Sequence, residues 1–371
     1  MKVKILLLLI FVFSAFSCGE FIGFGEFSSP DLGTITKTKI RINEAQLKRL
    51  YDSVSKTESS YAPCRVETPH YRNSAFLRVR GYTSRGKPKK NFTLKQFVNN
   101  RYEKYALSPC YKTWGKNHIL MYAYNRVGLF APEVKSTALF VNGKYLGYYS
   151  SSRMYDPTSL KEFFHGNGGE LFKVHLDSYS ENPLYSKSEK KFPKNNNYTS
   201  LERLVYNTEH MTPSEWRSWI SSNFDWEMAV KYLIVHDFFA VSDTTKQNFY
   251  IYHDKKYVIL PWDNEISFDI NYFSIGGDSK ITKKLMDIDF VKTKYKEEFN
   301  YYFINGAGTE GVLKAEITAE INRIYAEMDK SVKEDPVFYY SYNDFLRCKQ
   351  SVIDFYDDRI AAGIEAMVNN L

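Results

Sequence analysis

Residues 243–268 read DTTKQNFYIYHDKKYVILPWDNEISF, and no other segment says as much about the architecture. The segment follows the strongly apolar run 225–240, which predicts a buried helix. Within it, the apolar runs of residues 247–262 on either side of a polar turn predict a β-hairpin. Polar residues therefore stand at the exit of a buried helix and again directly after a hairpin. Side chains at such exits can converge without being buried themselves. The segment is therefore a candidate for a catalytic or ligand-binding site.

The acids of this segment have the spacing of a phosphoryl-transfer site. Asp243 precedes Asn248 by five residues, as in a kinase catalytic loop, where the aspartate takes the acceptor hydroxyl's proton and the asparagine holds a metal ion. Asp263 and Glu265 follow the hairpin and could supply the other metal contacts. Mg²⁺ prefers oxygen ligands and keeps several waters, so two or three protein oxygens suffice. Ordinary turns use the same residue types, so the spacing alone leaves both interpretations open.

A basic segment lies upstream of these acids. Residues 80–92 read RGYTSRGKPKKNF, which predicts a strand end, a Gly-containing turn and the start of a second strand. Backbone amides and basic side chains in such a turn can hold phosphates. The segment is neither a Walker loop nor a GxGxxG motif. A basic surface hairpin is therefore the alternative interpretation.

Four sequence blocks, in this order, resemble the CotH-type spore-coat protein kinase family. They are RGYTSRGKPKKNF (80–92), FVNGKYLGYY (140–149), DTTKQNFYIY (243–252) and VILPWDNEISF (258–268). The resemblance covers about residues 70–270. It implies an atypical protein-kinase-like fold and ATP-dependent transfer of phosphate to Ser or Thr of secreted or surface proteins, with Mg²⁺ or Mn²⁺ as the metal.

The resemblance also implies roles for individual residues. Asp243 occupies the position of the family's catalytic aspartate. Asn248, Asp263 and Glu265 occupy the metal-binding positions. Contacts to the nucleotide phosphates are implied for four residues of the basic segment: Arg80, Ser84, Lys89 and Lys90.

Three departures from the family pattern suggest a second hypothesis. Val241 stands where the family usually has Asn, and Glu265 stands where it usually has Asp. Arg153 stands where the family has Glu, which reverses a charge. At about 4 Å and an effective dielectric of 20, one repelling pair costs about 4 kcal/mol. The alternative to an active kinase is therefore a catalytically degenerate CotH-fold protein that serves in surface binding, adhesion or structure.

The N-terminus predicts export. Residues 2–17, KVKILLLLIFVFSAFS, combine two lysines, an apolar run and small residues, the pattern of a secretory signal peptide. Ala15-Phe16-Ser17-Cys18 also resembles a loose lipoprotein box, in which Cys18 would be lipidated. Plain secretion and a lipid-anchored surface protein both stay open, and the membrane would be involved only through that anchor.

The remaining composition predicts one large domain. The chain has 371 residues, 43% hydrophobic and 25% charged, which is typical of globular proteins. Removing residues 1–17 would lower the net charge from +7 to +5, an excess too mild to argue for nucleic acid. Strands early and helices late predict an α+β class, β-rich in its N-terminal part and helical in its C-terminal part. We expect a tether at 18–38 and a CotH-like kinase domain at 39–371, with an exposed insertion at about 177–200.

Local signals predict several elements of this domain. A capping box precedes a helix at about 43–56, and alternation within 75–98 predicts two strands. Asn142-Gly143 within 134–150 is a strong hairpin signal. Further helices are expected at 114–128, after the Thr212-Pro213-Ser214-Glu215 cap and from about 280 onward.

The cysteines and histidines suggest no metal motif. An oxidising compartment permits a disulfide, and Cys64 with Cys110 is the pair we favour, since both follow proline. Cys348 would then be a buried thiol. The seven histidines show no HExxH or paired spacing, so zinc is not expected. His236 lies in the apolar run and is expected to be a satisfied core residue.

Overall fold

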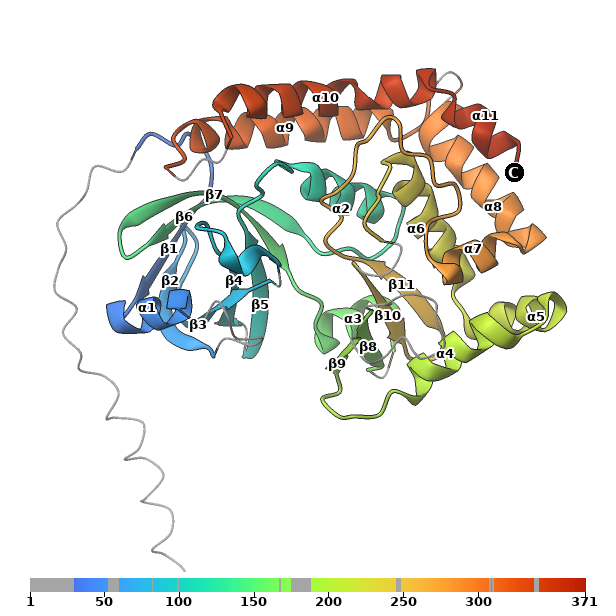
Figure 1. Cartoon of the computed structure of the whole chain (residues 1–371), viewed down its shortest axis with the longest axis horizontal. Helices are drawn as coiled ribbons and strands as arrows, with labels where there is room; N and C mark the ends of the chain where they lie inside the picture. The colour runs from blue at the N-terminus through green and yellow to red at the C-terminus, as the bar shows by residue number, and fades with distance from the viewer. Residues whose placement is uncertain are drawn as a thin grey trace, which may run out of the picture. The chain divides into compact units, whose positions relative to one another are not determined.

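The first half of the chain folds into seven strands that close into a barrel in the order β1-β2-β3-β4-β5-β7-β6 (Figure 1). The computed structural model describes residues 30–371, apart from 53–59, 82, 99, 167, 175–187, 245–247, 307, 309 and 337–339. A parallel pairing of β1 with β6 closes the barrel, and all its other pairings are antiparallel. The strands are β1 (Lys37–Ile42), β2 (Ala62–Glu67), β3 (Arg72–Arg80), β4 (Asn91–Val98), β5 (Arg101–Ser108), β6 (Val134–Val141) and β7 (Lys144–Arg153).

Alternation of apolar and polar residues explains which side of each strand fills the barrel. Leu77 and Val79 of β3 pack inside with Phe92 of β4 and are almost fully buried. Arg78 and Arg80 point the other way, because successive side chains of a strand face opposite sides. The outer face of β3, β4 and β5 therefore carries Arg78, Arg80, Thr93, Lys95 and Lys104, which alternate with the inward residues. A short 3₁₀ turn (Thr83–Gly86) joins β3 to β4.

The predicted Asn142-Gly143 hairpin joins β6 to β7. Both residues have positive φ, 49° and 80°, as the turn requires. The Asn142 side chain also accepts from the backbone N–H of Ile42 and donates to its carbonyl, each at 2.8 Å. The turn residue thus ties the hairpin to the end of β1 and helps to close the barrel.

A second sheet of four strands follows, in the order β11-β10-β8-β9. The expected hairpin at 247–262 supplies its two strands β10 and β11, paired in register from Phe249↔Pro261 to His253↔Tyr257. Helix α6 packs on β11, so the predicted buried helix at 225–240 is observed. The elements of this part are α3 (Pro157–Phe164), β8 (Glu170–Val174), β9 (Glu189–Phe192), α4 (Thr199–His210), α5 (Pro213–Asn223), α6 (Trp226–Phe238), β10 (Phe249–His253) and β11 (Tyr257–Pro261).

The C-terminal third is helical, as predicted. Helices α9 and α10 pack against each other, and α9 also covers β6 and β7 of the barrel (Figure 1). The remaining helices are α1 (Glu44–Asp52), α2 (Lys116–Arg126), α7 (Lys280–Met286), α8 (Asp289–Phe299), the π-helical turn η3 (Asn300–Asn305), α9 (Lys314–Lys333), α10 (Tyr342–Ala361) and α11 (Ile364–Asn369). The predicted mixture of α and β structure is therefore confirmed.

The structure moves two predicted boundaries. The segment 18–38 was expected to be a tether, but Leu32 and Ile35 are buried in the core and β1 begins at Lys37. The expected exposed insertion at about 177–200 falls partly on residues outside the described ones. The described remainder includes β9, which pairs with β8, and Lys190 is buried there. The predicted signal peptide lies entirely outside the described residues, and within the described ones no helix is both long and apolar enough to cross a membrane.

The predicted Cys64–Cys110 disulfide is wrong, because both cysteines are free and buried. Cys64 lies inside the barrel, whereas Cys110 belongs to the other core and its Sγ faces Ser150 Oγ at 3.1 Å. Burial raises the pKa of both thiols to about 12. Cys348, predicted to be a buried thiol, is half-buried on α10 and contacts the Tyr325 hydroxyl.

Candidate active site

The loop between α6 and β10 carries the predicted catalytic residue. Asn248 Nδ2 donates to Asp243 Oδ2 at 2.8 Å and to the Asp243 carbonyl at 3.1 Å. The structure therefore brings these two residues together, although residues 245–247 between them lie outside the described part. Ala240 and Asn248 both have positive φ, 53° and 65°. Left-handed backbone at non-glycine residues is concentrated at functional loops, and here it brackets Asp243.

A second pair of acids follows β11. Asp263 has φ of 58°, and Glu265 Oε2 accepts from Thr113 Oγ1 at 3.1 Å. Burial and the neighbouring Asp263 carboxylate raise the pKa of Glu265 to about 7. The two acids therefore repel each other, which is the arrangement that a bound cation relieves. Asn264, between them, is buried, and its side-chain oxygen and nitrogen have no hydrogen-bond partner among the described residues.

Arg80, Lys87 and Lys173 are cations close to these acids. The guanidinium of Arg80, at the end of β3, lies 5.7 Å from the ring centre of Trp262 and helps to lower the pKa of Glu265 against the two opposing effects. Lys173 of β8 stands opposite Tyr250 of β10. Burial first, and then Arg80, lowers the pKa of Lys173, while Asp263 raises it. Arg80 was predicted from the sequence, whereas Lys173 was missed. Its only signal is that it is a lysine between the apolar residues of a short strand.

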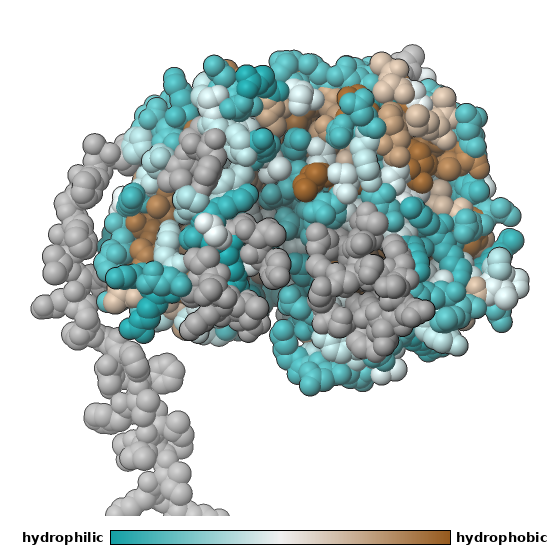
Figure 2. Space-filling model, viewed as in Figure 1, coloured by the Kyte–Doolittle hydropathy of each residue, from teal (hydrophilic) through white to brown (hydrophobic). Residues whose placement is uncertain are grey.

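Further cations line the outer face of the barrel beside this point. Arg78 of β3 stands opposite Thr93 of β4, and Lys95 opposite Lys104 of β5. Burial lowers the pKa of Lys104, as do Arg78 and three lysines around it, two of which lie at and after β9. Figure 2 shows a notch between the barrel and the side that carries β9 and α4, with hydrophilic residues on its borders. The second sheet and the barrel thus present basic side chains toward each other.

Several polar atoms in this region are buried without a hydrogen-bond partner among the described residues. They include Arg78 Nε, Thr93 Oγ1 and Trp262 Nε1. A buried donor or acceptor that lacks a partner costs about 1–3 kcal/mol. Three such atoms close to a surplus of positive charge favour the binding of a ligand that carries oxygen acceptors. We call the surface formed by Arg78, Arg80, Thr93, Lys173 and Trp262 the cleft face.

The other predicted phosphate contacts are engaged within the chain. Lys89 is buried and forms an ion pair with Asp335, which also accepts from the backbone N–H of Tyr148 at 2.9 Å. A Cβ on Gly147 would lie 2.1 Å from the Asp335 carboxylate, so glycine is needed at that position. Lys90 Nζ donates to the Arg85 carbonyl at 2.6 Å. The side chain of Ser84 lies outside the described part of the chain.

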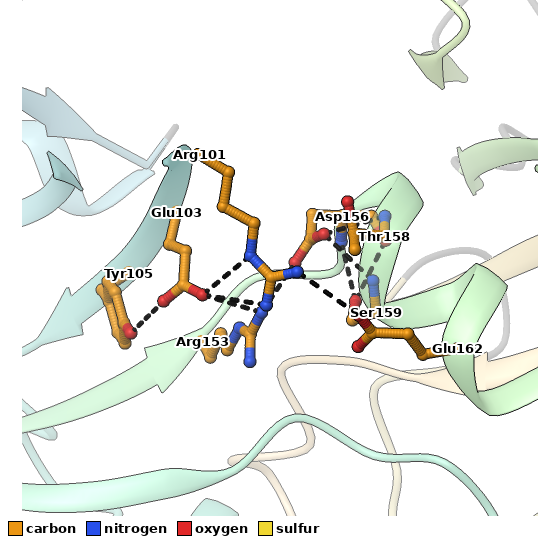
Figure 3. Close-up of polar contacts among 8 residues, drawn as sticks. All are labelled: Arg101, Glu103, Tyr105, Arg153, Asp156, Thr158, Ser159 and Glu162. Atoms are coloured by element: carbon orange, nitrogen blue, oxygen red, sulfur yellow. Dashed lines mark hydrogen bonds and ion pairs between the residues drawn. The ribbon is translucent and has the colours of Figure 1, made fainter. Parts of the chain in front are cut away.

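The reversed charge at position 153 is balanced by the neighbouring strand (Figure 3). Arg153 of β7 approaches Glu103 Oε1 of β5 at 3.0 Å and Asp156 Oδ2 at 3.2 Å. Glu103 is buried and also pairs with Arg101 at 3.3 Å, while Tyr105 donates to its other oxygen at 2.6 Å. Arg153 therefore has two carboxylate partners, and the repulsion expected from the sequence does not arise.

Asp156 connects this cluster to α3. It is the N-cap of that helix, and its side chain accepts from the backbone N–H groups of Thr158 and Ser159. The cluster of Arg101, Glu103, Arg153 and Asp156 thus joins two barrel strands to the helix that leads into the second sheet.

The predicted metal ligands are two acids and an amide. Within the described ranges, no three His, Cys, Asp or Glu side chains converge closely enough to hold a metal ion. The set predicted from the sequence includes one amide, Asn248, and two acids, Asp263 and Glu265. The structure brings the two acids together, and the role of the set as metal ligands stays a prediction.

Acids that face arginine and lysine at the junction of two sheets, beside a loop with paired Asp and Asn, are typical of a phosphoryl-transfer protein. The sequence profile of the CotH kinase protein family matches residues 77–362. The chain therefore belongs to the CotH kinase family, which confirms the resemblance found in the four sequence blocks.

Two other comparisons add little. The crystal structure of a Helicobacter pylori proinflammatory kinase, CtkA, is 13% identical to this chain and covers 79% of it and 95% of its own length, with a TM-score of 0.32. At that TM-score the superposition is too loose to carry an argument. No curated protein matches the chain.

Proposed function

We propose that this chain is an ATP- and divalent-metal-dependent protein kinase with an atypical kinase-like fold. It would transfer phosphate to Ser or Thr of secreted or surface proteins, after export through a signal peptide or as a lipoprotein anchored at Cys18. Membership of the CotH kinase family supports the reaction class. The observation that carries the proposal is the cleft face, where Arg80 and Lys173 meet Asp263 beside buried polar atoms that have no hydrogen-bond partner among the described residues.

The residues present fit both a nucleotide and a metal ion. Arg78 Nε and Trp262 Nε1 are donors without an acceptor in the described part of the chain, and phosphate and ribose oxygens are acceptors that would satisfy them. Asp263 and Glu265 are close enough for the first to raise the pKa of the second. A divalent cation bound to these two acids would remove their repulsion and offset the charge of the nucleotide phosphates.

The proposed roles of the chain's residues follow from this placement. Asp243, oriented by Asn248, would accept the proton of the acceptor hydroxyl. Arg80 and Lys173 would bind phosphate oxygens and stabilise the charge that develops on them. Asp263, Glu265 and the side-chain oxygen of Asn248 would hold Mg²⁺ or Mn²⁺. Lys89 and Lys90 could contribute only after releasing their present partners.

The engagement of both lysines favours a second candidate function. A CotH-fold protein in which Lys89 is committed to Asp335 and Lys90 to the Arg85 carbonyl has fewer cations to offer to a nucleotide. Such a protein could serve in surface binding, adhesion or structure without phosphate transfer.

The two candidates separate in one experiment. The wild-type protein is incubated with ATP labelled at its γ-phosphate and Mg²⁺ or Mn²⁺, alone and with casein or histone as acceptors. We expect label in the protein or an acceptor, and a loss of about 100-fold or more in Asp243→Asn and Asp263→Asn. Asp358→Asn, which removes the same charge from an exposed position of α10, is the matched control. Equal labelling of all four proteins would contradict the kinase mechanism.

A binding measurement supports the distinction. ATP with Mg²⁺ at millimolar concentration should raise the melting temperature, since a ligand of the native state stabilises it. The absence of any shift, together with no label transfer, would favour the second candidate.

A further inference from the structure

A buried hydrogen-bond network lies directly behind the loop that carries Asp243. His236 and Asp237 belong to the last turn of α6, and Thr244 follows Asp243 in the loop. All three are at most 3% exposed. His236 Nδ1 lies 2.8 Å from Asp237 Oδ1, and His236 Nε2 lies 2.5 Å from Thr244 Oγ1. The imidazole thus bridges the helix end and the loop.

The partners of Asp237 indicate which ring nitrogen of His236 carries a proton. The Asp237 carboxylate accepts from the backbone N–H groups of Gly276 and Gly277, at 2.6 and 3.2 Å, and from the Tyr295 hydroxyl at 2.8 Å. Both glycines have positive φ, 85° and 74°, which lets successive N–H groups point at one carboxylate. Since Asp237 accepts throughout, His236 Nδ1 carries the proton. In the neutral imidazole Nε2 is then an acceptor, and the Thr244 hydroxyl donates to it.

The end of α6 is held from the opposite side as well. Arg359 of α10 is fully buried and donates to the carbonyls of Asp237, Phe238 and Ile270 at 2.9, 3.2 and 3.3 Å. These carbonyls include ones that a helix C-terminus leaves without intrahelical partners. The helix end from which His236 projects is therefore fixed, and the position of Thr244 is defined relative to a rigid support.

The space around the Thr244 hydroxyl is tightly filled. The small cavity beside Tyr232, His236, Thr244 and Asp278 has no space for a water molecule. The Tyr232 hydroxyl also forms a hydrogen bond with Thr244. Removing the threonine hydroxyl would therefore leave the imidazole and the phenol unsatisfied, and the loop would lose its attachment to α6.

We propose that His236 and Thr244 are positioning residues that fix Asp243 in place for its reaction. One end of the loop is held by the Thr244–His236 bond and the other by the Asn248–Asp243 bond. Asp243 stands next to the first anchor, so a shift of Thr244 displaces the carboxylate directly. A displacement of about 1 Å can cost about 100-fold in rate. The consequence for rate rests on the proposed kinase activity, whereas the anchoring of the loop does not.

The activity test compares two substitutions of one residue. Thr244→Val removes the hydroxyl with little change of shape, and Thr244→Ser keeps it. We expect Thr244→Val to lower kcat by about 10–100-fold with the KM for ATP changed less than about twofold, and Thr244→Ser to retain at least about a third of wild-type kcat. Thr208→Val is the matched control, since Thr208 is equally buried and its hydroxyl bonds within α4, to the Leu204 carbonyl at 2.8 Å. Equal kcat in Thr244→Val and Thr208→Val would overturn the proposal.

A second measurement decides the anchoring without any activity. Hydrogen–deuterium exchange of a peptide that spans residues 240–250 is compared in the same variants. We expect exchange at least about tenfold faster in Thr244→Val, and wild-type rates in Thr244→Ser and Thr208→Val. Unchanged exchange in Thr244→Val would overturn the anchoring. If the wild-type protein transfers no phosphate, the proposed function fails while this measurement still decides the inference.

His236→Asn gives an independent variant in case Thr244→Val does not fold. Asparagine can still donate to Asp237 but is too short to reach Thr244. We expect it to reproduce the faster exchange of the loop, and normal exchange in a folded His236→Asn protein would count against the proposal.

Discussion

Two regions that flank the candidate active site differ in how their buried polar groups are satisfied. At the end of α6, His236 and the Asp237 carboxylate find all the partners described above within the chain. On the cleft face, Arg78 Nε, Thr93 Oγ1 and Trp262 Nε1 are buried and find no partner in the described part of the protein. The described part of the fold therefore satisfies the polar groups behind Asp243 by itself, whereas the proposed function assigns the three atoms of the cleft face to a bound ligand.

Charge follows the same division. The Asp237 carboxylate accepts hydrogen bonds from neutral donors, and the Arg359 guanidinium donates to the Asp237 backbone carbonyl. On the cleft face, burial first and then Arg80 lower the pKa of Lys173, and nearby acids such as Asp263 oppose that effect. Like charges held close together destabilise a fold unless a counter-charge joins them. The first region should therefore lose stability when a charge is removed, and the second should not.

The largest expected effect is the loss of the Asp237 charge. Asp237→Asn keeps the size of the side chain but presents an amide to donors that need an acceptor. We expect the free energy of unfolding to fall by about 3–5 kcal/mol, the range for breaking a buried charged network. Urea denaturation measures it. Asp358→Asn, on the exposed side of α10, should change it by less than about 0.5 kcal/mol. A loss of less than about 1 kcal/mol for Asp237→Asn would mean that the hydrogen bonds to the Asp237 carboxylate contribute little to stability.

Local sequence patterns predicted some of the elements around this network but not its long-range hydrogen bonds. The helix that carries His236, the hairpin after it and the turn at Asn142-Gly143 were all predicted, because hydrophobic periodicity and turn residues act over a few positions. His236 was correctly expected to be a satisfied core residue. Its partner Thr244 lies only eight residues away, yet nothing local indicates that the chain turns back to place that hydroxyl against the ring.

Partners distant in sequence were not predictable. Lys89 was predicted to contact nucleotide phosphates because it lies in a basic turn. Its ion-pair partner Asp335 is 246 residues away in the sequence. Arg153 looked like a defect because Glu103 is brought beside it only by the pairing of β5 with β7. Asp243 and Asn248 were singled out by their spacing together with the family resemblance, because the spacing alone is also that of ordinary turns. Lys173 was not, because a lysine in a short strand gains its meaning only when β8 is placed beside β10.

The second prediction concerns His118, a buried side chain outside the cleft face. His118 of α2 lines a cavity of about 400 Å³ bordered also by Glu320 and Arg323 of α9, and its Nδ1 has no partner among the described residues. Burial lowers the pKa of His118 to about 4. The unfolded chain takes up this proton near pH 6.5 and the folded chain does not. Stability should therefore fall as the pH drops from 6.5 toward 4.

Between pH 7 and pH 5 this difference amounts to about 2 kcal/mol. Urea denaturation of the wild type and of His118→Gln at both pH values measures it. The substituted protein should lack this part of the pH dependence. Identical pH dependence of the two proteins would show that His118 takes up its proton equally well in the folded protein, with Glu320 at 3.6 Å as the partner of the imidazolium, and the prediction would be wrong.

The third prediction concerns the cluster in Figure 3. Glu103→Gln leaves Arg101 and Arg153 facing each other without their shared carboxylate. Each arginine side chain is 31% exposed, so water compensates in part, and we expect a loss of about 1–2 kcal/mol in the free energy of unfolding. Glu162, which also pairs with Arg101 but is 66% exposed, supplies the control. Glu162→Gln should change stability by less than about 0.5 kcal/mol, and an equal effect of both substitutions would mean that Arg153 gains nothing from Glu103.

The smallest expected effect separates the two regions most directly. Lys173→Gln removes a cation whose pKa is lowered in the folded protein, which means that the fold disfavours its charged form. We therefore expect the free energy of unfolding to stay constant or to rise by up to about 1 kcal/mol, the opposite sign to Asp237→Asn. The same substitution should reduce the rise in melting temperature that ATP with Mg²⁺ produces, because a phosphate partner is lost. Lys144→Gln, on an exposed position of β7, should alter neither quantity. If Lys173→Gln destabilised the protein and left the ATP effect intact, Lys173 would be a structural residue like Asp237. The proposed difference between the cleft face and the end of α6 would then be wrong for this residue.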